Sequence, residues 1–418
     1  MTPEGDKLPL PLNGIRVLDA THIVAGPFCS MILADMGADV IKIERPGTGD
    51  LARARVHFIE SEDGRQISSR FLGVNRNKRS VSIDLRNPRC KQAFEELVRN
   101  SDVLVDNWGS GAFKRLGLGF EHLNAINPGL VYASITGYGD SEGLTGPYSA
   151  RPANNLAIQA MSGWMEITGD PDGPPQSVGD NIGDSIPGVW AALSIVLALE
   201  TRRQTGNGQY LDMAMYECMV SHIESNMNFF QALGSNPGRS RDRLATAGIT
   251  FKAKDGYVVL AGLRTEARMR DLWTLLGRDD LLEGDLRYLA GPGMDGQFYH
   301  DHVIPAIELW SSQLGKFDVA AKLTEIGFSM GVTQTMADLD ACPQLNARQM
   351  FLETGDTLGG MFRGVKTPAR LTACIDSPTE PPPKLGEHNR EILCTLGGMT
   401  PQELAALEVE GALEMCYA

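Results

Sequence analysis

Apolar and polar residues follow one another along residues 1–140 in an order that predicts strands and helices in turn. Short apolar runs with β-branched residues, typical of buried strands, occur at residues 14–20, 38–44, 80–85, 102–106 and 130–136. Helices are predicted at 27–36, which opens on Pro27 and stops before Gly37, and at 88–99. These repeated strand–helix–strand units predict an α/β fold with a parallel sheet covered by helices on both faces.

The pattern changes beyond residue 140. A long helix at 185–203, a strand at 210–213 and a further helix to about residue 230 are followed by a polar stretch, 234–243, that is typical of a linker. Residues 249–261 predict a hairpin turning at 254–256, and Thr400 begins a capping box for a final helix. We therefore expect a large domain in residues 1–232, a small domain in 244–325, and a return to the large domain with a C-terminal helix in 326–418.

Composition narrows the function classes. The 418 residues carry a net charge of -14, which argues against a nucleic-acid partner. The longest apolar run, 189–199, is shorter than the roughly 20 residues that span a bilayer, so no membrane role is expected. No secretory signal pattern is present at the N-terminus, and the cytoplasm is the expected location. The seven cysteines lack a Cys-x-x-Cys pair, which argues against a disulfide framework and against a metal site.

Several nucleotide and hydrolase motifs are missing. The turn after the first strand, residues 22–27, contains one glycine and not the Gly-x-Gly-x-x-Gly of dinucleotide-binding folds. No P-loop, Gly-x-Ser-x-Gly elbow or His-Glu-x-x-His motif occurs. These absences argue against NAD binding, nucleotide hydrolysis, serine-hydrolase chemistry and zinc proteolysis.

Ligands of parallel sheets bind beside the carboxyl ends of the strands, which makes the loops after Asp19, Ile43, Leu85 and Val105 the candidate site. Basic residues gather near these loops: Lys42, Arg45, Arg76, Lys78, Arg79, Arg86, Lys114 and Arg115. They suit the phosphates of coenzyme A (CoA). They also suit a solvated basic face with surface ion pairs, and composition alone leaves both interpretations open.

Asp184 ends a loop rich in glycine and proline, residues 168–185, directly before the long helix. An aspartate in that place is either a helix cap, which stabilises by roughly 1 kcal/mol, or a nucleophile. His22 and His388 also stand in loops, where structural and ligand-contact roles are equally open.

Ordered motifs across about 370 residues resemble the family III CoA-transferases. They include Leu-Asn-Gly-Ile-Arg-Val-Leu-Asp-Ala-Thr-His-Ile-Val-Ala-Gly-Pro at 12–27, the run 33–47, Asn-Arg-Asn-Lys-Arg-Ser at 75–80, and Ser-Ile-Thr-Gly-Tyr-Gly at 134–139. Gln-Ala-Met-Ser-Gly at 159–163, Ile-Thr-Gly at 167–169 and Leu-Gly-Glu-His at 385–388 fit as well. Formyl-CoA transferase, carnitine CoA-transferase and succinyl-CoA:dicarboxylate transferases belong to this family.

The resemblance implies a fold, a chemistry and a site. The fold would be a Rossmann-like large domain whose parallel sheet is built from both chain ends, plus a smaller α+β domain, and two chains would interlock as a homodimer. Asp184 would be the nucleophile. CoA would contact His22, Val24, Ala25, Arg45, Ile83, Asp84, Leu85, Arg86, Asn107, Trp108, Gly109 and Arg115. Acyl-CoA and a carboxylic acid would be the substrates, with no permanently bound cofactor and no metal.

Two departures from the family pattern bear on the substrate. Val24 stands where formyl-CoA transferase carries a glutamine, which puts formate–oxalate exchange in doubt. Asn154 and Asn155 stand where the family usually has an aromatic residue followed by Asp or Glu, and they are expected near the acyl group. An α-methylacyl-CoA racemase, the alternative within the superfamily, would need a proton-shuttling histidine near Asn154, and an amide cannot shuttle a proton. A non-catalytic acyl-CoA-binding protein is the other alternative.

The expected reaction moves CoA from an acyl-CoA, with succinyl-CoA favoured, to a free acid through an aspartyl anhydride and an aspartyl-CoA thioester. A helix N-terminus is expected to keep Asp184 ionised, and N–H groups of the flanking glycines to stabilise oxyanions. Arg239, Arg241, Arg264 and Arg268 could bind a second carboxylate or could be surface charges.

Overall fold

The computed structural model describes residues 7–54, 57–60, 66–236, 238–239, 248–261, 265–278, 295–355 and 360–416. The chain divides into two compact units. Unit 1 comprises Met1–Trp164, Ser177–Ile223 and Arg348–Ala418, and unit 2 comprises Met165–Gln176 and Glu224–Ala347. Each unit is described separately.

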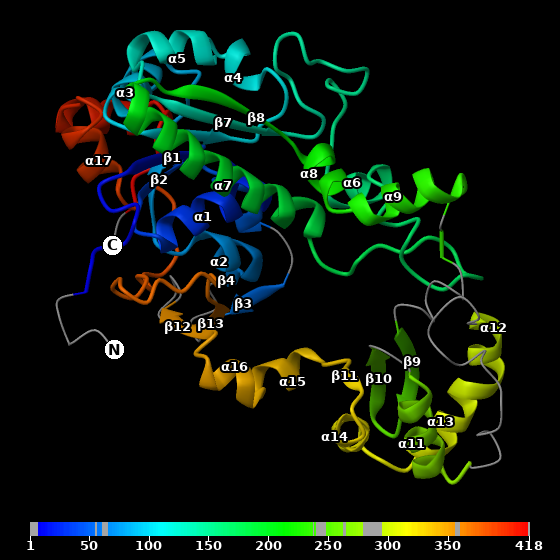
Figure 1. Ribbon diagram of the computed structural model, residues 1–418. Coiled ribbons are helices and arrows are strands. Elements are labelled where there is room, and N and C mark those ends of the chain that lie inside the picture. The colour runs from blue at the N-terminus through cyan, green and yellow to red at the C-terminus, as the bar shows by residue number, and fades with distance from the viewer. Residues whose placement is uncertain are drawn as a thin grey trace. The chain divides into compact units, whose positions relative to one another are not determined.

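A six-stranded, fully parallel sheet forms the centre of unit 1 (Figure 1). Its strands are β1 (Arg16–Ala20), β2 (Asp39–Glu44), β5 (Lys78–Ser82), β6 (Val103–Asp106), β7 (Val131–Thr136) and β8 (Gln209–Ala214). Their order is β5-β2-β1-β6-β7-β8. The chain therefore builds outward from β1 in one direction through β2 and β5, and in the other through β6, β7 and β8.

Alternate residues of each strand enter one of two cores, as the period of a strand requires. Leu18 and Ile41 join the core covered by α3 (Pro88–Arg99), α5 (Phe120–Ile126), α17 (Asn389–Thr395) and α18 (Pro401–Val409). Val17 and Val40 join the opposite core, under α1 (Ala25–Asp35), α6 (Asn155–Met161), α7 (Ile182–Thr205) and α8 (Met215–Ser221). The predicted two-sided α/β arrangement is thus present.

The C-terminal part of the chain was expected to contribute to this sheet, and that expectation is wrong for the described residues. All six strands come from residues 16–214. Residues 389–409 supply helices α17 and α18, whose apolar side chains Ile392, Leu393, Leu404 and Leu407 are buried against α3 and the sheet. The C-terminal segment bonds to β5 and the residue after it without forming a strand: the N–H of His388 donates to the carbonyl oxygen of Ser80 at 3.0 Å, and Ile83 forms an isolated bridge with Leu413.

Smaller elements complete unit 1. They are the 3-10 turn Leu51–Ala54, β3 (Phe58–Glu60) paired with β4 (Gln66–Ser68), α2 (Ser69–Asn75), α4 (Ala112–Arg115), and the hairpin of β12 (Phe351–Gly355) and β13 (Met361–Val365). The predicted hairpin at 249–261 is present in unit 2, as described next.

Unit 2 has its own antiparallel sheet and core. β9 (Gly248–Ala253), β10 (Gly256–Ala261) and β11 (Ser329–Val332) form the sheet, in the order β11-β10-β9. It packs with α11 (Glu266–Leu276), α12 (Gly296–Phe298), the π-helix Tyr299–Val303, α13 (Ile304–Ser311) and α14 (Lys316–Glu325) around Trp273 and Phe251. Helices α9 (Glu224–Leu233), α15 (Met336–Asp340) and α16 (Pro343–Ala347) also belong to it. The predicted domain boundaries stay a prediction. Unit 2 extends beyond residue 325, where the small domain was expected to end, because β11 pairs with β10.

Glycines set how closely the helices of unit 1 approach. A Cβ added to Gly188 of α7 would lie 2.8 Å from the carbonyl oxygen of Ala25, so α1 and α7 cross with their backbones nearly touching. A Cβ on Gly183 would lie 2.5 Å from the carbonyl oxygen of Asn155, the first residue of α6. The beginning of α7 is therefore held against the beginnings of two other helices.

Within the described residues, α7 is the one helix whose length and composition would allow a membrane span. Core helices of soluble proteins pass the same test, and one side of α7 is buried against α1. Its other side carries the exposed apolar residues Val189, Trp190, Leu193, Val196 and Leu197, each between 37% and 59% exposed.

Candidate active site

The strand order reverses between β1 and β6, which is the topological switch point of the parallel sheet. The loops that follow these two strands are hydrogen-bonded to each other. The N–H of His22 donates to Oδ1 of Asn107 at 2.9 Å, and Nδ2 of Asn107 donates to the carbonyl oxygen of His22 at 2.9 Å. One side chain thus satisfies both backbone groups of His22. In open α/β sheets this switch point is where ligands bind, so the predicted candidate site has a well-defined floor.

Ile23, the next residue, has a φ of 71°, a conformation that a β-branched residue rarely adopts. Its N–H donates to Oδ1 of Asp50 at 2.9 Å, and the same oxygen accepts the N–H of Ala52 at 2.8 Å. The carboxylate of Asp50 therefore holds the strained residue in place, and the strain indicates that surrounding contacts determine the shape of this loop. The chain then enters α1 through Val24 and Ala25, both buried.

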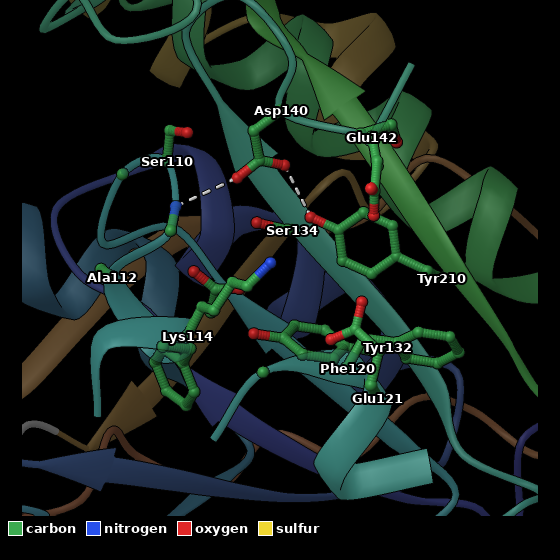
Figure 2. A pocket seen from close by; sticks show the side chains of 16 residues that line it. Ser110, Ala112, Lys114, Phe120, Glu121, Tyr132, Ser134, Asp140, Glu142 and Tyr210 are labelled. Carbon is green, nitrogen blue, oxygen red and sulfur yellow. Dashed lines mark hydrogen bonds between the residues drawn. The ribbon is translucent and has the colours of Figure 1, made fainter. Parts of the chain in front are cut away.

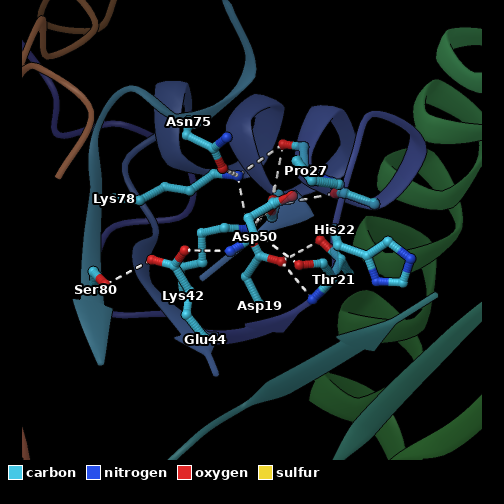
Figure 3. A network of polar contacts seen from close by, with 12 residues as sticks. Asp19, Thr21, His22, Pro27, Lys42, Glu44, Asp50, Asn75, Lys78 and Ser80 are labelled. Atoms are coloured by element: carbon cyan, nitrogen blue, oxygen red, sulfur yellow. Dashed lines mark hydrogen bonds and ion pairs between the residues drawn. The ribbon is translucent and has the colours of Figure 1, made fainter. Parts of the chain in front are cut away.

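Asp50 belongs to a network of buried charges beneath this loop (Figure 3). Nζ of Lys42 lies 2.8 Å from Oδ2 of Asp50 and donates to the carbonyl oxygen of Thr21 at 3.0 Å. Nζ of Lys78 lies 2.9 Å from Oδ2 of Asp19. Burial alone would raise the pKa of Asp19, but Lys42, Lys78 and two hydrogen bonds hold it well below its usual value. Burial lowers the pKa of Lys78 to about 8, against the opposing effect of Asp19.

This network corrects the expectation for the basic cluster. Lys42, Lys78 and Arg76 are buried, and Arg76 pairs with Asp35 at 2.5 Å. Arg79 pairs with Asp39 at 2.6 Å. These four cations are occupied by carboxylates of the fold and are neither phosphate ligands nor a solvated face, because pairing compensates the cost of burying charge.

Three of the other predicted CoA-contacting residues remain accessible near the switch point. The guanidinium carbon of Arg45 lies 5.0 Å from the ring centroid of Trp108, a cation–π distance. Nη1 of Arg115 donates to the carbonyl oxygen of Ser110 at 3.1 Å, and Arg45 and Arg115 are both exposed. Gly109, in the loop after β6, is also exposed and has a φ of 94°. An anionic ligand at the switch point would meet these two cations.

The segment 83–86 has mixed exposure. Ile83 and Leu85 are buried in the core of unit 1, so their side chains cannot meet a ligand in this arrangement. Arg86 is exposed and pairs with its neighbour Asp84, Nη2 to Oδ2, at 2.9 Å. The hydrogen bond from Arg86 lowers the pKa of Asp84. Contacts from this segment would come from its backbone and from Arg86.

Asp184 is not the cap of α7, which corrects one of its two interpretations. Asn181 holds the N-cap position, and Asp184 is the third residue of the first turn, with its own N–H bonded to the carbonyl oxygen of Asn181 at 2.9 Å. The N–H of Gly183 donates to Oδ1 of Asn155 at 2.9 Å. That glycine N–H, expected to stabilise an oxyanion, is therefore already engaged.

Burial raises the pKa of Asp184 to about 6, and the nearby Arg70 guanidinium opposes that rise only in part. The helix N-terminus was expected to help keep this carboxylate ionised, and a pKa of about 6 leaves it ionised at neutral pH although the pKa is raised. Desolvation has the larger effect, because a half-buried carboxylate loses hydration that a helix end replaces incompletely. A carboxyl group with a raised pKa and no tight ion pair is a recognised property of catalytic positions.

The two asparagines have different positions. Oδ1 of Asn154 accepts the N–H of Ala157 at 3.0 Å and caps α6, while the residue itself is exposed. Asn155 is half-buried, and its Oδ1 accepts from Gly183 and from Nε2 of Gln159 at 3.0 Å. Asn155 therefore joins the start of α6 to the turn that carries Asp184, whereas Asn154 has a capping role.

A cavity of about 540 Å³ lies beside the carboxyl end of β6 and against β7 and β8, and the loop after β6 also lines it (Figure 2). Asp106, Asp140, Tyr132 and Tyr210 line it, and the hydroxyl of Tyr210 donates to Asp140 at 2.7 Å. Burial raises the pKa of Asp106 to about 6, against hydrogen bonds from Tyr132 and Ser134. Lys114, a member of the predicted basic cluster, also lines the cavity, but Asp106, Glu121, Asp140 and Glu142 outnumber it. This mainly acidic lining does not suit phosphates, so an anionic ligand is expected on the side of Arg45.

Sequence reasoning missed Asp50 and Arg70. The only available signal was their place between the second and third predicted strands of the sheet, in the segment that follows the predicted phosphate loop. Of the four arginines expected to bind a second carboxylate, Arg241 and Arg264 lie outside the described residues, and Arg239 and Arg268 belong to unit 2.

Comparison with known proteins finds relatives across nearly the whole chain. The family model described as CoA-transferase family III matches residues 12–389. A succinyl-CoA:mesaconate CoA-transferase from Haloarcula marismortui is 35% identical over 92% of this chain and 96% of its own length. A formyl-CoA:oxalate CoA-transferase from Streptomyces avermitilis is 33% identical over 96% of this chain and 99% of its own. A crystal structure of a CAIB/BAIF family protein from Brucella suis has a TM-score of 0.83 at 33% identity, covering 94% of this chain and 100% of that one.

Proposed function

This chain belongs to CoA-transferase family III and is a CoA-transferase, and we propose that it uses Asp184 as a covalent nucleophile to move CoA from an acyl-CoA to a free carboxylic acid. One observation carries the proposal. Asp184 is a half-buried carboxylate with a pKa raised to about 6, at the start of a helix that crosses α1 beside the switch point. Such a group is ionised at neutral pH and poorly solvated, as a carboxylate nucleophile should be.

The reaction consists of four acyl transfers that balance without a net proton. Asp184 attacks the thioester carbonyl, the carbon–sulfur bond breaks, and a mixed anhydride and CoA thiolate form. The thiolate attacks the aspartyl carbonyl, which releases the donor acid and leaves an aspartyl-CoA thioester. The acceptor carboxylate attacks that carbonyl, forming a new anhydride and thiolate. Thiolate attack on the acyl carbonyl then releases the new acyl-CoA and restores Asp184.

CoA is proposed to bind at the switch point. Arg45 and Arg115 would bind its phosphates, and Trp108 would offer an apolar face beside Arg45. The loop from His22 to Ala25 and Asn107 would line the path of the pantetheine arm toward α7. The fixed backbone of this loop supports the assignment, since a preformed surface loses little conformational freedom when a long flexible ligand binds.

Succinyl-CoA is the proposed donor. The succinyl-CoA:mesaconate enzyme from H. marismortui supports this choice by similarity. The racemase alternative receives no support from the site, because Asn154 caps α6 and carries no titratable proton. The alternative of a non-catalytic acyl-CoA-binding protein is tested by hydroxylamine trapping and by the Asp184→Ala variant.

We also propose a cytoplasmic homodimer. The exposed apolar side of α7 supports a second copy as its partner, because a row of five large apolar residues is unfavourable in water. Replacing both Leu193 and Leu197 by glutamate should convert the dimer to a monomer in sedimentation equilibrium. A wild-type protein that sediments as a monomer at micromolar concentration would refute this part.

Hydroxylamine trapping tests the mechanism. The enzyme is incubated with succinyl-CoA, glutaryl-CoA, formyl-CoA or butyryl-CoA, quenched with hydroxylamine, and digested for peptide mass analysis. The true donor should convert Asp184 to a hydroxamate, and the exposed Asp180 should stay unmodified as the internal control. An unmodified Asp184 with every donor, in a protein that is folded and active, would reject the covalent mechanism. An Asp184→Ala variant that retained full activity would favour a different mechanism altogether.

A further inference from the structure

Arg70 is a cation in an unusual place. It lies on α2 and is half-buried, and its Nη1 reaches the first turn of α7, where it donates to Oδ1 of Asn181 at 3.5 Å. No carboxylate oxygen lies within 4.0 Å of its guanidinium among the residues that the structure describes. Within the described part of the chain, its direct partner is thus a neutral amide at the limit of hydrogen-bonding distance.

The other buried or half-buried arginines that the structure describes in unit 1 have carboxylate partners. Arg53 pairs with Glu44 at 2.7 Å, Arg76 with Asp35 at 2.5 Å, and Arg79 with Asp39 at 2.6 Å. The fold therefore compensates its buried guanidinium groups as a rule. Arg70 differs from them because no carboxylate among the residues described for unit 1 forms an ion pair with it.

The position of Arg70 beside the beginning of α7 adds to the electrostatic cost of leaving its charge unpaired. The N-terminus of a helix carries a partial positive charge, so a cation there is repelled, whereas an anion is stabilised. Arg70 and the beginning of α7 therefore both attract negative charge to the same point. A ligand carboxylate would satisfy the guanidinium and the helix end together, and Arg is well suited to bind one bidentately.

The relation to Asp184 indicates which carboxylate this is. Arg70 is close enough to lower the pKa of Asp184 in part, yet the two groups make no contact within 4.0 Å. A carboxylate that attacks the aspartyl carbonyl must come within bonding distance of Asp184. One held by a guanidinium is neutralised and is a weak nucleophile, so the guanidinium suits a carboxylate that does not react.

We infer that Arg70 binds the non-reacting carboxylate of a dicarboxylic acid substrate, while the other carboxylate exchanges CoA at Asp184. This inference rests on the proposed function of Asp184, and it makes Arg70 the residue that selects dicarboxylic over monocarboxylic acids. Arg70 thereby takes the part that sequence reasoning had offered to four arginines beyond residue 238.

Pairs of donors that differ only at the far end test the inference. Succinyl-CoA and butyryl-CoA have four-carbon acyl groups ending in a carboxylate or a methyl group, and glutaryl-CoA and valeryl-CoA form a second pair. Arg70→Gln should lower kcat/KM for the dicarboxylic member about 10- to 100-fold, the loss of a charge-assisted hydrogen-bonded pair. The monocarboxylic member should change less than about twofold. Arg70→Lys should restore part of the preference, because it keeps the charge and loses the planar fork.

Arg203→Gln serves as the matched control, since Arg203 is exposed at the far end of α7 and pairs with Glu200. It should leave both members of each pair unchanged. Equal losses for both members in Arg70→Gln, with the same thermal midpoint as wild type, would overturn the inference. So would an unchanged preference, or a wild-type enzyme that does not prefer the dicarboxylic member of either pair. Hydroxamate trapping on the wild type separates the two proposals, because a labelled Asp184 with unchanged preference in Arg70→Gln rejects only the role of Arg70.

Discussion

Replacing Asp184 by asparagine should stabilise the protein at pH 8 while abolishing its chemistry. The substitution keeps the size of the side chain and removes its charge. In the folded state burial raises the pKa of Asp184 from 3.8 to about 6, so the ionised form is less favourable in the folded than in the unfolded chain. Each tenfold change in proton affinity corresponds to about 1.4 kcal/mol, so ionised Asp184 costs the folded state up to about 3 kcal/mol at pH 8.

The sign and pH dependence follow from this difference. Because the folded-state pKa is raised, the folded protein binds the extra proton between pH 6 and pH 4, and the cost disappears as the pH falls through that range. The gain from Asp184→Asn should therefore be up to about 3 kcal/mol at pH 8, decline below pH 6, and vanish near pH 4.

Urea unfolding followed by circular dichroism at pH 8, 6 and 4.5 measures the effect. Asp180→Asn is the matched control, because Asp180 is exposed in the loop just before the same helix. If Asp184 mainly stabilised the helix end, asparagine would lower the free energy of unfolding at pH 8 by about 0.3–1 kcal/mol. Such a loss, or a gain that does not vary with pH, would refute the idea that the fold holds a costly charge at this position.

Three further results are expected. The value of kcat/KM should rise about tenfold per pH unit up to pH 6 and then level off, since the free enzyme needs ionised Asp184; a flat profile between pH 5 and 7 would contradict this. Asp50→Asn removes the closer of the two carboxylates beside the buried Lys42 and leaves Asp19 at 3.8 Å, so it should lower the free energy of unfolding by about 3 kcal/mol in a urea titration, and a loss below about 1 kcal/mol would show that the network tolerates the change. Gly188→Ala, whose Cβ would lie 2.8 Å from a backbone oxygen of α1, should cost about 1–3 kcal/mol, whereas Gly146→Ala, with no atom within 4 Å, should cost little; equal midpoints would refute the close helix crossing.

The regular elements of unit 1 could be predicted because local signals agreed with the tertiary environment. Helix α3 occupies 88–99 as expected, since Asn87 caps it, Pro88 opens it and its apolar residues recur at helical spacing. The strands were recognisable as short runs of apolar residues, and their carboxyl ends indicated the candidate loops. Which segments form the sheet was harder to predict. An apolar C-terminal segment is expected to be buried, but its sequence does not say whether it pairs with a strand or covers a face of the sheet.

Charges within the fold could not be predicted. Lys42 and Lys78 stand in strands, and nothing in the sequence indicates that Asp19 and Asp50 meet them across different elements. The electrostatic environment of Asp184 was likewise hidden, because it depends on how deeply a helix end is buried. Sequence reasoning therefore placed Asp184 at a helix end but missed the burial that raises its pKa.

The amide of Asn155 has a consequence for the working range of the enzyme. It fixes the turn that carries the proposed nucleophile, and it does so without adding a second negative charge next to Asp184. A carboxylate in its place would make the same hydrogen bond but would raise the proton affinity of Asp184 further, toward or beyond neutrality. Two interacting acids would then share one proton, and the fraction of enzyme ready to attack would fall in a neutral medium. The uncharged neighbour instead leaves a single acid that titrates on its own, so the proposed nucleophile would be ionised in nearly every molecule at pH 7 and above.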